Sequence, residues 1–268
     1  MIESSFLGGG GYICSNLFPL YNDTDCGALF LSRSSSKPGI SRFETYMDIP
    51  PSRVIFDFSH RADGLDIIKE SDMLIALENI KKNASRCEKY FFISTASINI
   101  NDSLLCQNNK YAESKKNLEE HLLNSKNIYI LRLPLVFGDV PKQDTVINVL
   151  LKIIKGQNVI LRDPNAFFTA LHINDLKKGI DAIMSNELDI NTFHSTSKVL
   201  MSEEVLLPVG KLSLIMRSLV QQDIFHPNDD LIKDLEMLSM PIQSFDTHFL
   251  PVKNFNFIRR LLNILRKG

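Results

Sequence analysis

The sequence of 268 residues contains no tryptophan, only four cysteines and no apolar run of the ~18 residues that a membrane-spanning helix needs. The cysteines, at positions 14, 26, 87 and 106, form no CxxC pair and no cluster with histidines, so we expect no metal site. The N-terminus also lacks a basic export signal. We therefore expect a cytoplasmic protein with reduced thiols.

An excess of charge of one sign is missing as well. Thirty basic residues face 31 acidic ones, and the net charge of -1 argues against a nucleic-acid partner. The apolar fraction of 44% and the charged fraction of 23% are ordinary for a globular protein. Function must therefore be inferred from local motifs.

The first such motif is a run of four glycines, residues 8–11, that follows an apolar segment at 2–7. Glycine adopts positive φ and lets other groups approach the backbone closely. The pattern predicts a strand, a sharp turn and a helix over about 12–21. The amide groups and the dipole at the start of such a helix attract an anion, so we infer a dinucleotide pyrophosphate at this turn.

Strand and helix patterns alternate beyond this turn, which is typical of βαβ units and a parallel sheet. The fold class we predict is α/β, a Rossmann-type doubly wound parallel sheet with a smaller C-terminal α/β lobe. Residues 1–140 form the dinucleotide-binding domain and 141–268 the substrate lobe, partly interleaved with it. The individual expectations are strands at 27–31, 53–58, 90–93 and 127–133 and helices at 66–82, 111–123, 145–155 and 174–184.

Four weaker patterns complete the assignment. We expect short strands at 45–47, 158–161 and 191–194. Ser202, followed by two glutamates, has the pattern of a helix start.

A candidate catalytic pair lies on the predicted helix 111–123. Tyr111 and Lys115 are four residues apart and hence on one face. An ammonium group beside a phenol lowers the phenol's pKa, which allows proton exchange near neutrality. Thr95 follows an apolar strand, at the edge where ligands bind in open α/β sheets, and its hydroxyl can hold a carbonyl oxygen. Each signal is weak alone, since a helix-surface tyrosine and a loop-capping threonine are common.

Together these motifs resemble the extended short-chain dehydrogenases/reductases of the nucleotide-sugar epimerase/dehydratase type. The segments that carry the resemblance occur in the family's order: Gly8–Ile13 (GGxGFI), Phe92–Ile98, Tyr111–Lys115 (YxxSK), Leu131–Gly138 (LRxxxVYG) and Leu171–Leu176 (HVDDL). The resemblance makes Thr95, Tyr111 and Lys115 the catalytic residues.

The resemblance also implies a set of coenzyme-binding residues. The set comprises Gly8, Gly11, Tyr12, Ile13, Ser32, Arg33, Asp48, Ile49, Phe58, Ser59, Tyr111, Lys115 and Pro134. Members that prefer NAD end the second strand with an acidic residue, whereas this chain has Ser32 and Arg33 there. Because Arg33 can pair with a 2′-phosphate, we expect NADP(H) to be favoured over NAD(H).

Several positions depart from the family pattern, among them Cys14, Ala96, Ser97, Asn99 and Leu135, and the segment from Thr95 to Tyr111 is shorter than usual. Cys14 replaces the third glycine of the turn, for which we expect a slight displacement of the helix. Ala96 and Ser97 replace the acidic pair of the 4,6-dehydratases, so elimination of water has no evident acid and base. We therefore exclude a dehydratase.

The function we predict is NAD(P)H-dependent reduction of a keto group on a nucleotide-linked sugar, of the 4-ketohexose reductase type, as in polysaccharide biosynthesis. A nucleotide-sugar 4-epimerase is the alternative within enzymes. A catalytically silent protein that binds the coenzyme as a sensor or scaffold is the alternative of another class.

Two further expectations concern partners. The resemblance implies a homodimer formed through the helices at 66–82 and 111–124. The basic amphipathic segment 257–267 suits either an anionic membrane surface or, as we favour, packing on the substrate lobe or a dimer partner. Of the remaining residues, His172 is expected to be buried and His60 to lie in a solvated loop.

Overall fold

The computed structural model describes residues 2–22, 27–34, 37–60, 70–98, 110–123, 125–140, 142, 145–157, 159, 167–168, 170–185, 198–202, 207–222, 247–251 and 257–267. The strand expected at 191–194 lies outside these ranges, as does that at 158–161 apart from residue 159.

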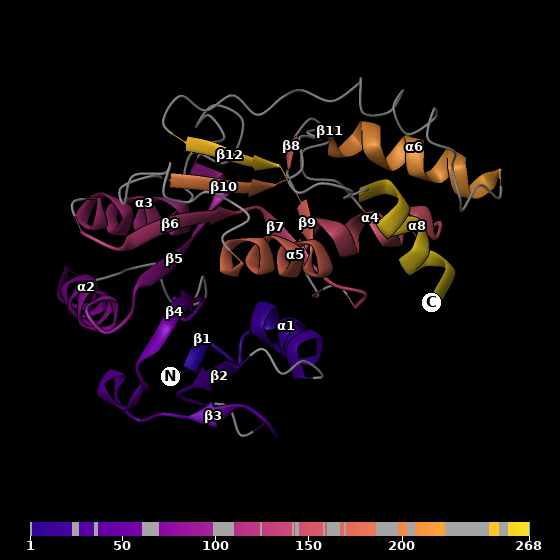
Figure 1. Ribbon diagram of the computed structural model, residues 1–268. Coiled ribbons are helices and arrows are strands. Elements are labelled where there is room, and N and C mark those ends of the chain that lie inside the picture. The colour runs from indigo at the N-terminus through magenta and orange to yellow at the C-terminus, as the bar shows by residue number, and fades with distance from the viewer. Residues whose placement is uncertain are drawn as a thin grey trace.

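The centre of the molecule is a parallel sheet of eight strands (Figure 1). In spatial order the strands are β12 (Thr247–Pro251), β10 (Lys198–Ser202), β6 (Ile128–Leu133), β5 (Lys89–Thr95), β4 (Ser52–Asp57), β1 (Ile2–Leu7), β2 (Ala28–Ser32) and β3 (Ser41–Arg42). All neighbouring strands run parallel. This confirms the predicted Rossmann-type α/β fold, and β10 and β12 show that the second half of the chain extends the sheet of the first.

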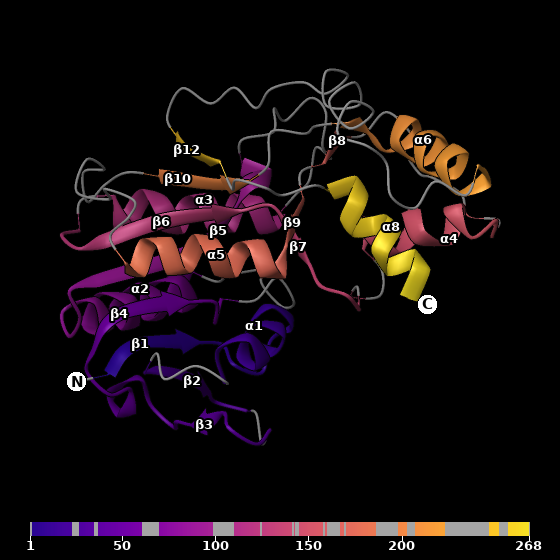
Figure 2. The same cartoon turned by 45° about the vertical axis from the view of Figure 1, so that its right-hand side comes forward.

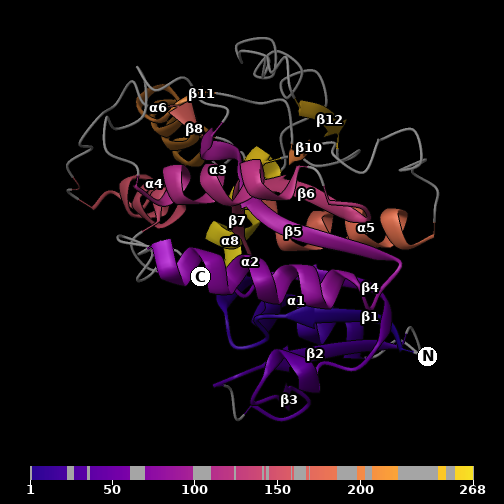
Figure 3. The ribbon, with the colours of Figure 1, turned by 90° about the vertical axis from the view of Figure 1, so that its left-hand side faces the viewer.

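Helices cover both faces of the sheet. The helices are α1 (Tyr12–Asn22), α2 (Glu70–Ala84), α3 (Lys110–Leu122), α4 (Val146–Ile154), α5 (Ile173–Met184), α6 (Val209–Gln221) and α8 (Phe257–Lys267). One face packs against α1 and α5, whereas α2 and α3 lie side by side over the other (Figure 3).

An unbroken row of aromatic rings fills the core under α1 and α5. The strand register places each ring beside the next on one face, because register partners in parallel strands point to the same side. Ring centroids are 4.6–5.2 Å apart along the row, which consists of Phe30, Phe6, Phe56, Phe91 and Tyr129. Stacked rings of this kind add stabilisation beyond that of their buried area.

A smaller lobe lies beyond the carboxyl ends of the strands and contains α4, α6 and α8 (Figure 2). Two short strand pairs accompany it: β7 (Leu135–Phe137) with β9 (Ala170–His172), and β8 (Phe167–Phe168) with β11 (Leu207–Pro208). Leu261 and Leu262 of α8 are fully buried. The apolar face of this helix therefore packs on the protein, as we favoured from the sequence.

None of the described helices is long and apolar enough to span a membrane.

Two predictions of secondary structure were wrong. Residues 46–48 form a 3₁₀ turn, not a strand, because Thr45 caps the amide of Met47 and the carboxylate of Asp48 caps Thr45 in return. Ser202 ends β10 and does not open a helix, because residues 198–202 pair with β12 along their whole length. The next helix in the described residues, α6, starts at Val209.

Candidate active site

The glycine turn joins β1 to α1 and packs against two other strands. Gly8 has φ +90°, and a Cβ atom there would lie 2.7 Å from the carbonyl oxygen of Phe58. Gly9, which the sequence analysis did not single out, is equally constrained, since its Cβ would lie 2.8 Å from Ile40 Cγ2. The amides of Gly8 and Gly9 both donate to the carbonyl of Leu31, at 3.0 and 2.8 Å. A side chain at Gly8 would be strained and would clash with the backbone, and one at Gly9 would require Ile40 to move.

Gly11 serves a different purpose. A Cβ there would meet only the carbonyl oxygen of Gly8, at 3.2 Å, so the protein itself leaves space beside it. Tyr12 and Ile13 follow as the first residues of α1, where backbone amides have no partner within the helix. The turn therefore has the room and the positive electrostatic potential that a pyrophosphate requires.

Cys14, at the third glycine position, is buried and donates its thiol toward the carbonyl of Leu7, at 3.7 Å. Burial raises the pKa of this thiol well above its ordinary value, with a smaller contribution from the charge of Asp57. The side chain is thus an inert packing group. The slight displacement of α1 that we expected stays a prediction.

Two cations contact residues near the turn. Arg33 directly follows β2, and its guanidinium lies 5.6 Å from the ring centre of Tyr46, in cation–π geometry. The ammonium of Lys37, which the sequence analysis missed, donates to the hydroxyl of Ser15 in the first turn of α1, at 2.9 Å. Ser32, the remaining residue expected here, is buried, and its hydroxyl accepts from the amide of Ser34 at 3.3 Å.

The side chains of Asp48 and Ile49 are engaged by the protein. The carboxylate of Asp48 accepts from the amides of Thr45 and Glu44, at 2.7 and 3.2 Å, and the bond from Thr45 lowers its pKa. Ile49 is buried in the core under α2 and α3. Both side chains hold the local chain in place, and their contact with an adenine stays a prediction.

The segment Phe58–His60, which follows β4, closes the floor of the turn. Phe58 donates its amide to the carbonyl of Leu7, at 3.0 Å. Ser59 donates both its amide and its hydroxyl to Asp57, at 2.9 and 2.5 Å. His60 is not in a solvated loop as expected: its Nε2 lies 3.1 Å from Asp57 Oδ2, and its ring lies 5.5 Å from that of Phe92.

Of the three predicted catalytic residues, Tyr111 and Lys115 lie together at the start of α3, and Thr95 ends the strand whose Ile93 binds Lys115. Thr95 is the last residue of β5, and Tyr111 is the second residue of α3. The Lys115 side chain enters the same region, 2% exposed, with Nζ 5.9 Å from the ring centre of Tyr111 and 4.7 Å from that of Phe92. Its ammonium donates to the carbonyl of Ile93, at 2.8 Å.

The electrostatics of this group differ from the sequence prediction. Burial raises the pKa of Tyr111 to about 12, whereas we expected Lys115 to lower it. The reason is geometric, since the Lys115 ammonium lies by the tyrosine ring and is bonded to Ile93. Burial also lowers the pKa of Lys115 to about 8, opposed by the charges of Asp57 and, less, Glu119.

A buried ion pair supports α3 one turn further along. Arg132 of β6 donates from Nε and from a terminal nitrogen to the two carboxylate oxygens of Glu119, at 3.0 and 2.6 Å. The sequence analysis missed this pair. Its signals are the spacing of Tyr111, Lys115 and Glu119, which places them on one helix face, and an arginine inside an apolar strand.

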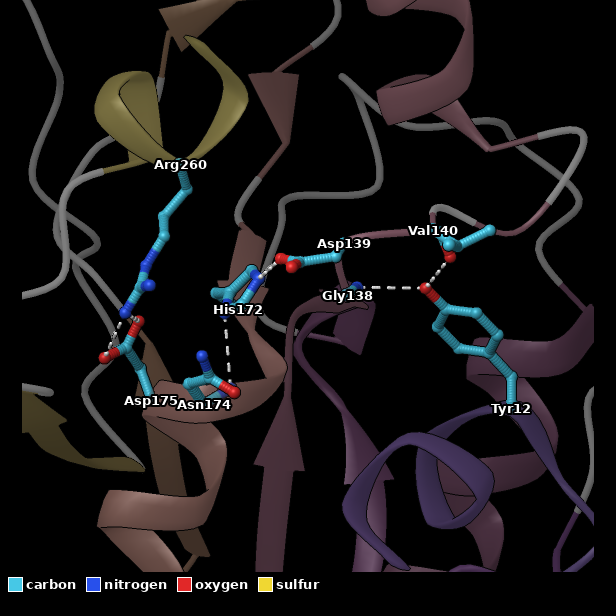
Figure 4. A network of polar contacts seen from close by, with 8 residues as sticks. All are labelled: Tyr12, Gly138, Asp139, Val140, His172, Asn174, Asp175 and Arg260. Carbon is cyan, nitrogen blue, oxygen red and sulfur yellow. Dashed lines mark hydrogen bonds and ion pairs between the residues drawn. The ribbon is translucent and has the colours of Figure 1, made fainter. Parts of the chain in front are cut away.

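Pro134 and the segment after it form the wall opposite α1. Pro134 is buried between β6 and β7. The hydroxyl of Tyr12 accepts from the amide of Gly138, at 2.9 Å, and donates to the carbonyl of Val140, at 3.0 Å (Figure 4). The first residue after the glycines thus ties the coenzyme turn to the entrance of the lobe.

The same wall continues into the lobe through a chain of polar contacts (Figure 4). His172, buried as expected, caps α5 by accepting from the amide of Asn174, and its Nε2 lies 3.3 Å from Asp139. Asp175, in the first turn of α5, accepts from Arg260 of α8, at 3.2 Å. Burial lowers the pKa of His172, and the nearby charge of Arg260 acts in the same direction.

These residues together fit a dinucleotide coenzyme. The glycine turn and the start of α1 would hold the pyrophosphate. Lys115 would hold the nicotinamide ribose beside Tyr111 and Thr95.

Comparisons with known proteins agree with this fold. No family model matches the chain, and no curated protein matches it. Solved structures do match: a UDP-N-acetylglucosamine 4-epimerase from Bacillus cereus is 14% identical over 100% of this chain and 96% of that chain, with a TM-score of 0.67. MoeE5, solved with UDP-glucose and NAD, is 13% identical over 99% of both chains, with a TM-score of 0.64.

A dTDP-glucose 4,6-dehydratase from Bacillus anthracis, solved with NAD, is 14% identical over 100% of this chain and 97% of that chain, with a TM-score of 0.63. At these identities the likeness establishes the fold. The chain thus shares the fold of these three proteins, which is the fold that its motifs indicated.

Proposed function

We propose that the protein is a nicotinamide-dependent oxidoreductase that reduces the keto group of a nucleotide-linked sugar, of the 4-ketohexose reductase type. The observation that carries the proposal is the buried ammonium of Lys115 beside Tyr111 and the end of β5. Fold likeness to proteins solved with UDP-glucose and NAD supports the class of substrate and coenzyme.

The chain's own residues provide the proton and the orientation. The coenzyme, when bound, supplies the hydride. Because burial raises its pKa to about 12, Tyr111 is protonated at neutral pH and can give its proton to the forming alkoxide. The Thr95 hydroxyl would orient the carbonyl oxygen, and Lys115 would anchor the ribose and polarise Tyr111.

The preference for NADP(H) is part of the proposal. No carboxylate ends β2, and the cations Arg33 and Lys37 lie near the turn. Fluorescence titration with NADPH and NADH measures the preference directly. We expect NADPH to bind at least about tenfold more tightly. Binding of NADH tenfold more tightly than NADPH would contradict the assignment.

A 4-epimerase is the second candidate, because a UDP-N-acetylglucosamine 4-epimerase is among the matching structures. An epimerase oxidises and re-reduces the same carbon, so it would retain its coenzyme and consume none. A protonated Tyr111 favours reduction as the first step. Formation of an epimer without net loss of NADPH would select the epimerase.

A homodimer is also proposed. Leu74 and Ile75 of α2 are 56% and 58% exposed, which leaves an apolar pair on the helix expected at the interface. Sedimentation of the protein and of a Leu74→Glu variant tests this, with loss of the dimer in the variant as the expected result. An unchanged dimer would show that another surface forms it.

Contact with an anionic membrane surface remains an alternative role for α8. Since Leu261 and Leu262 are buried, only the basic face of the helix would be available for this contact. Co-sedimentation with anionic liposomes tests the contact, and an Arg266→Glu variant that binds equally well would contradict it.

The test of the catalytic assignment is Tyr111→Phe, assayed with NADPH and a panel of nucleotide 4-keto sugars. We expect turnover to fall at least about a hundredfold, with coenzyme affinity changed less than about threefold. Tyr129→Phe is the matched control, because Tyr129 lies near the amino end of β6. A Tyr111→Phe variant as active as this control would contradict the assignment.

A further inference from the structure

Asp57 is a fully buried carboxylate for which the proposed mechanism has no use. It is the last residue of β4, and four donors surround it: the amide and the hydroxyl of Ser59, Nε2 of His60 and the hydroxyl of Tyr90. Despite the opposing effect of burial, His60 and these hydrogen bonds hold the pKa of Asp57 well below its usual range. A buried carboxylate is thus kept ionised beside the coenzyme turn.

The strand register places this carboxylate next to the catalytic lysine. Asp57 pairs with Phe92 of β5, so both side chains point toward the face that α3 covers. The Lys115 ammonium lies 4.7 Å from the centre of the same Phe92 ring. Both charged residues therefore neighbour Phe92 on this face of the sheet, and both are at most 2% exposed.

The other charged and titratable groups near Lys115 leave it short of a counter-charge. From α3 these are Tyr111, protonated at neutral pH, and Glu119. Glu119 is already bound through both oxygens to Arg132 of β6. Among the described residues, the hydrogen-bond partners of Asp57 are Ser59, His60 and Tyr90, and none of them is an arginine.

The groups near Asp57 can be described in the same way. They are His60 from the segment after β4, Tyr90 from β5, Tyr46 from the 3₁₀ turn and the thiol of Cys14 from α1. Of these, only the imidazole of His60 can carry a positive charge. The negative charge of Asp57 is therefore less neutralised by its neighbours than that of Glu119, so Asp57 attracts the Lys115 ammonium more strongly.

We propose that Asp57 is a positioning residue, whose carboxylate keeps the Lys115 ammonium charged beneath Tyr111 and fixes the segment Phe58–His60 against the glycine turn. The inference rests on the proposed role of Lys115 in catalysis. Without Asp57, a lysine with 2% exposure would retain, in the part of the chain that the structure describes, only a carboxylate that is shared with an arginine. Such a lysine loses its proton more readily and then holds a ribose hydroxyl less strongly.

The experiment is an NMR titration of the lysine side chains in the unliganded protein, in which a Lys115→Met variant assigns the Lys115 signal. In the wild type Lys115 should titrate at about 8. In Asp57→Asn we expect its pKa to fall to about 7 or lower, because an opposite charge at close range has been removed. In Tyr90→Phe, which removes a donor and keeps the carboxylate, the pKa of Lys115 should stay near 8.

Two results would overturn the proposal. One is a folded Asp57→Asn variant in which the pKa of Lys115 is unchanged. The other is an equal fall in Tyr90→Phe, which would show that packing and not charge is responsible.

Should Asp57→Asn fail to fold, the double variant Asp57→Asn/Lys115→Met tests whether the unpaired Lys115 charge is the cause. It should recover folding, since the ammonium without a counter-charge is then gone. A double variant that also fails to fold would overturn the proposal.

The titration needs neither coenzyme nor substrate, so it can succeed even if the proposed reduction is not found. Where activity is found, the alkaline limb of the kcat/KM profile should move to lower pH in Asp57→Asn by the same amount as the pKa of Lys115. An unmoved limb would show that Asp57 acts on folding alone.

Discussion

The sheet under α1 and α5 and the lobe around α5 and α8 both have buried apolar residues, but they differ in the further contacts that join their elements. In the sheet, five aromatic rings from five neighbouring strands stack in one row. In the lobe, the links named above are polar: His172 to Asp139, and Asp175 to Arg260. The sheet half should therefore tolerate changes of pH and salt that loosen the lobe half.

This difference agrees with the proposed roles of the two parts, in which the sheet half binds the coenzyme and the lobe binds the substrate. The coenzyme turn needs a rigid frame, which stacked rings at fixed register provide. A substrate lobe must admit and release a nucleotide sugar, and ion pairs at its edge can be exchanged at lower cost. Tyr12 joins the two, because it follows the glycine turn and bonds to Gly138 and Val140 at the entrance of the lobe.

The largest effect is expected from Phe56→Ala, at the centre of the aromatic row. Truncating a fully buried phenylalanine should lower the free energy of unfolding by about 3–5 kcal/mol. Urea unfolding measures this loss. Met47→Ala, at a side chain 63% exposed, is the control and should change stability little. A small loss of stability in Phe56→Ala would contradict the claim that the aromatic row stabilises the sheet.

Glu119→Gln should cause the next largest loss in the free energy of unfolding, since it removes the carboxylate that pairs with the buried Arg132. Breaking such a pair costs about 3–5 kcal/mol. The control is Glu78→Gln, which breaks the exposed pair with Lys82 and should have no measurable effect. Equal effects of the two substitutions in urea unfolding would contradict the account of this pair.

Arg260→Gln should loosen the lobe without unfolding the sheet. The loss of its bond to Asp175 should cost about 1–2 kcal/mol and speed hydrogen exchange in α8, but not in β1 or β4. Lys178→Gln is a matched control, because Lys178 binds the same carboxylate from within α5 and links no second element. Faster exchange of the sheet in Arg260→Gln would mean that the halves unfold together.

The smallest expected effect is that of pH on the lobe. Burial lowers the pKa of His172 from 6.5, so the unfolded chain binds a proton more readily than the folded one. The stabilisation is complete above about pH 6.5 and is lost as the pH falls below that value. Hydrogen exchange of α5 at pH 5.5 and 7.5 should reveal it, and His172→Gln should reduce the difference. If the difference in exchange between the two pH values is equally large in His172→Gln, a group other than His172 causes it.

Much of the fold was predictable because its causes are local. Alternating strand and helix patterns indicated the parallel sheet, and the run of glycines at 8–11 indicated the turn. The wrong predictions arose where pairing or capping decided the outcome. Ser202 belongs to a strand because β12 lies beside it, and residues 46–48 form a turn because of reciprocal caps.

The elements that carry Thr95, Tyr111 and Lys115 were predictable, since helix spacing and strand ends define them, whereas the catalytic roles of these residues stay predictions. Its electrostatics were not, because the depth of burial and the register between strands are not local properties. Asp57 illustrates this: only the pairing of β4 with β5 places it beside Phe92 and Lys115.

The central claim is that this chain uses a nicotinamide coenzyme to reduce a nucleotide-linked keto sugar, with Tyr111 as the proton donor. The most direct measurement is the loss of NADPH absorbance with a panel of nucleotide 4-keto sugars, for the wild type and Tyr111→Phe. The account predicts net consumption by the wild type with at least one sugar, and a rate at least about a hundredfold lower in the variant. No consumption with any sugar, or equal rates for the two proteins, would contradict it.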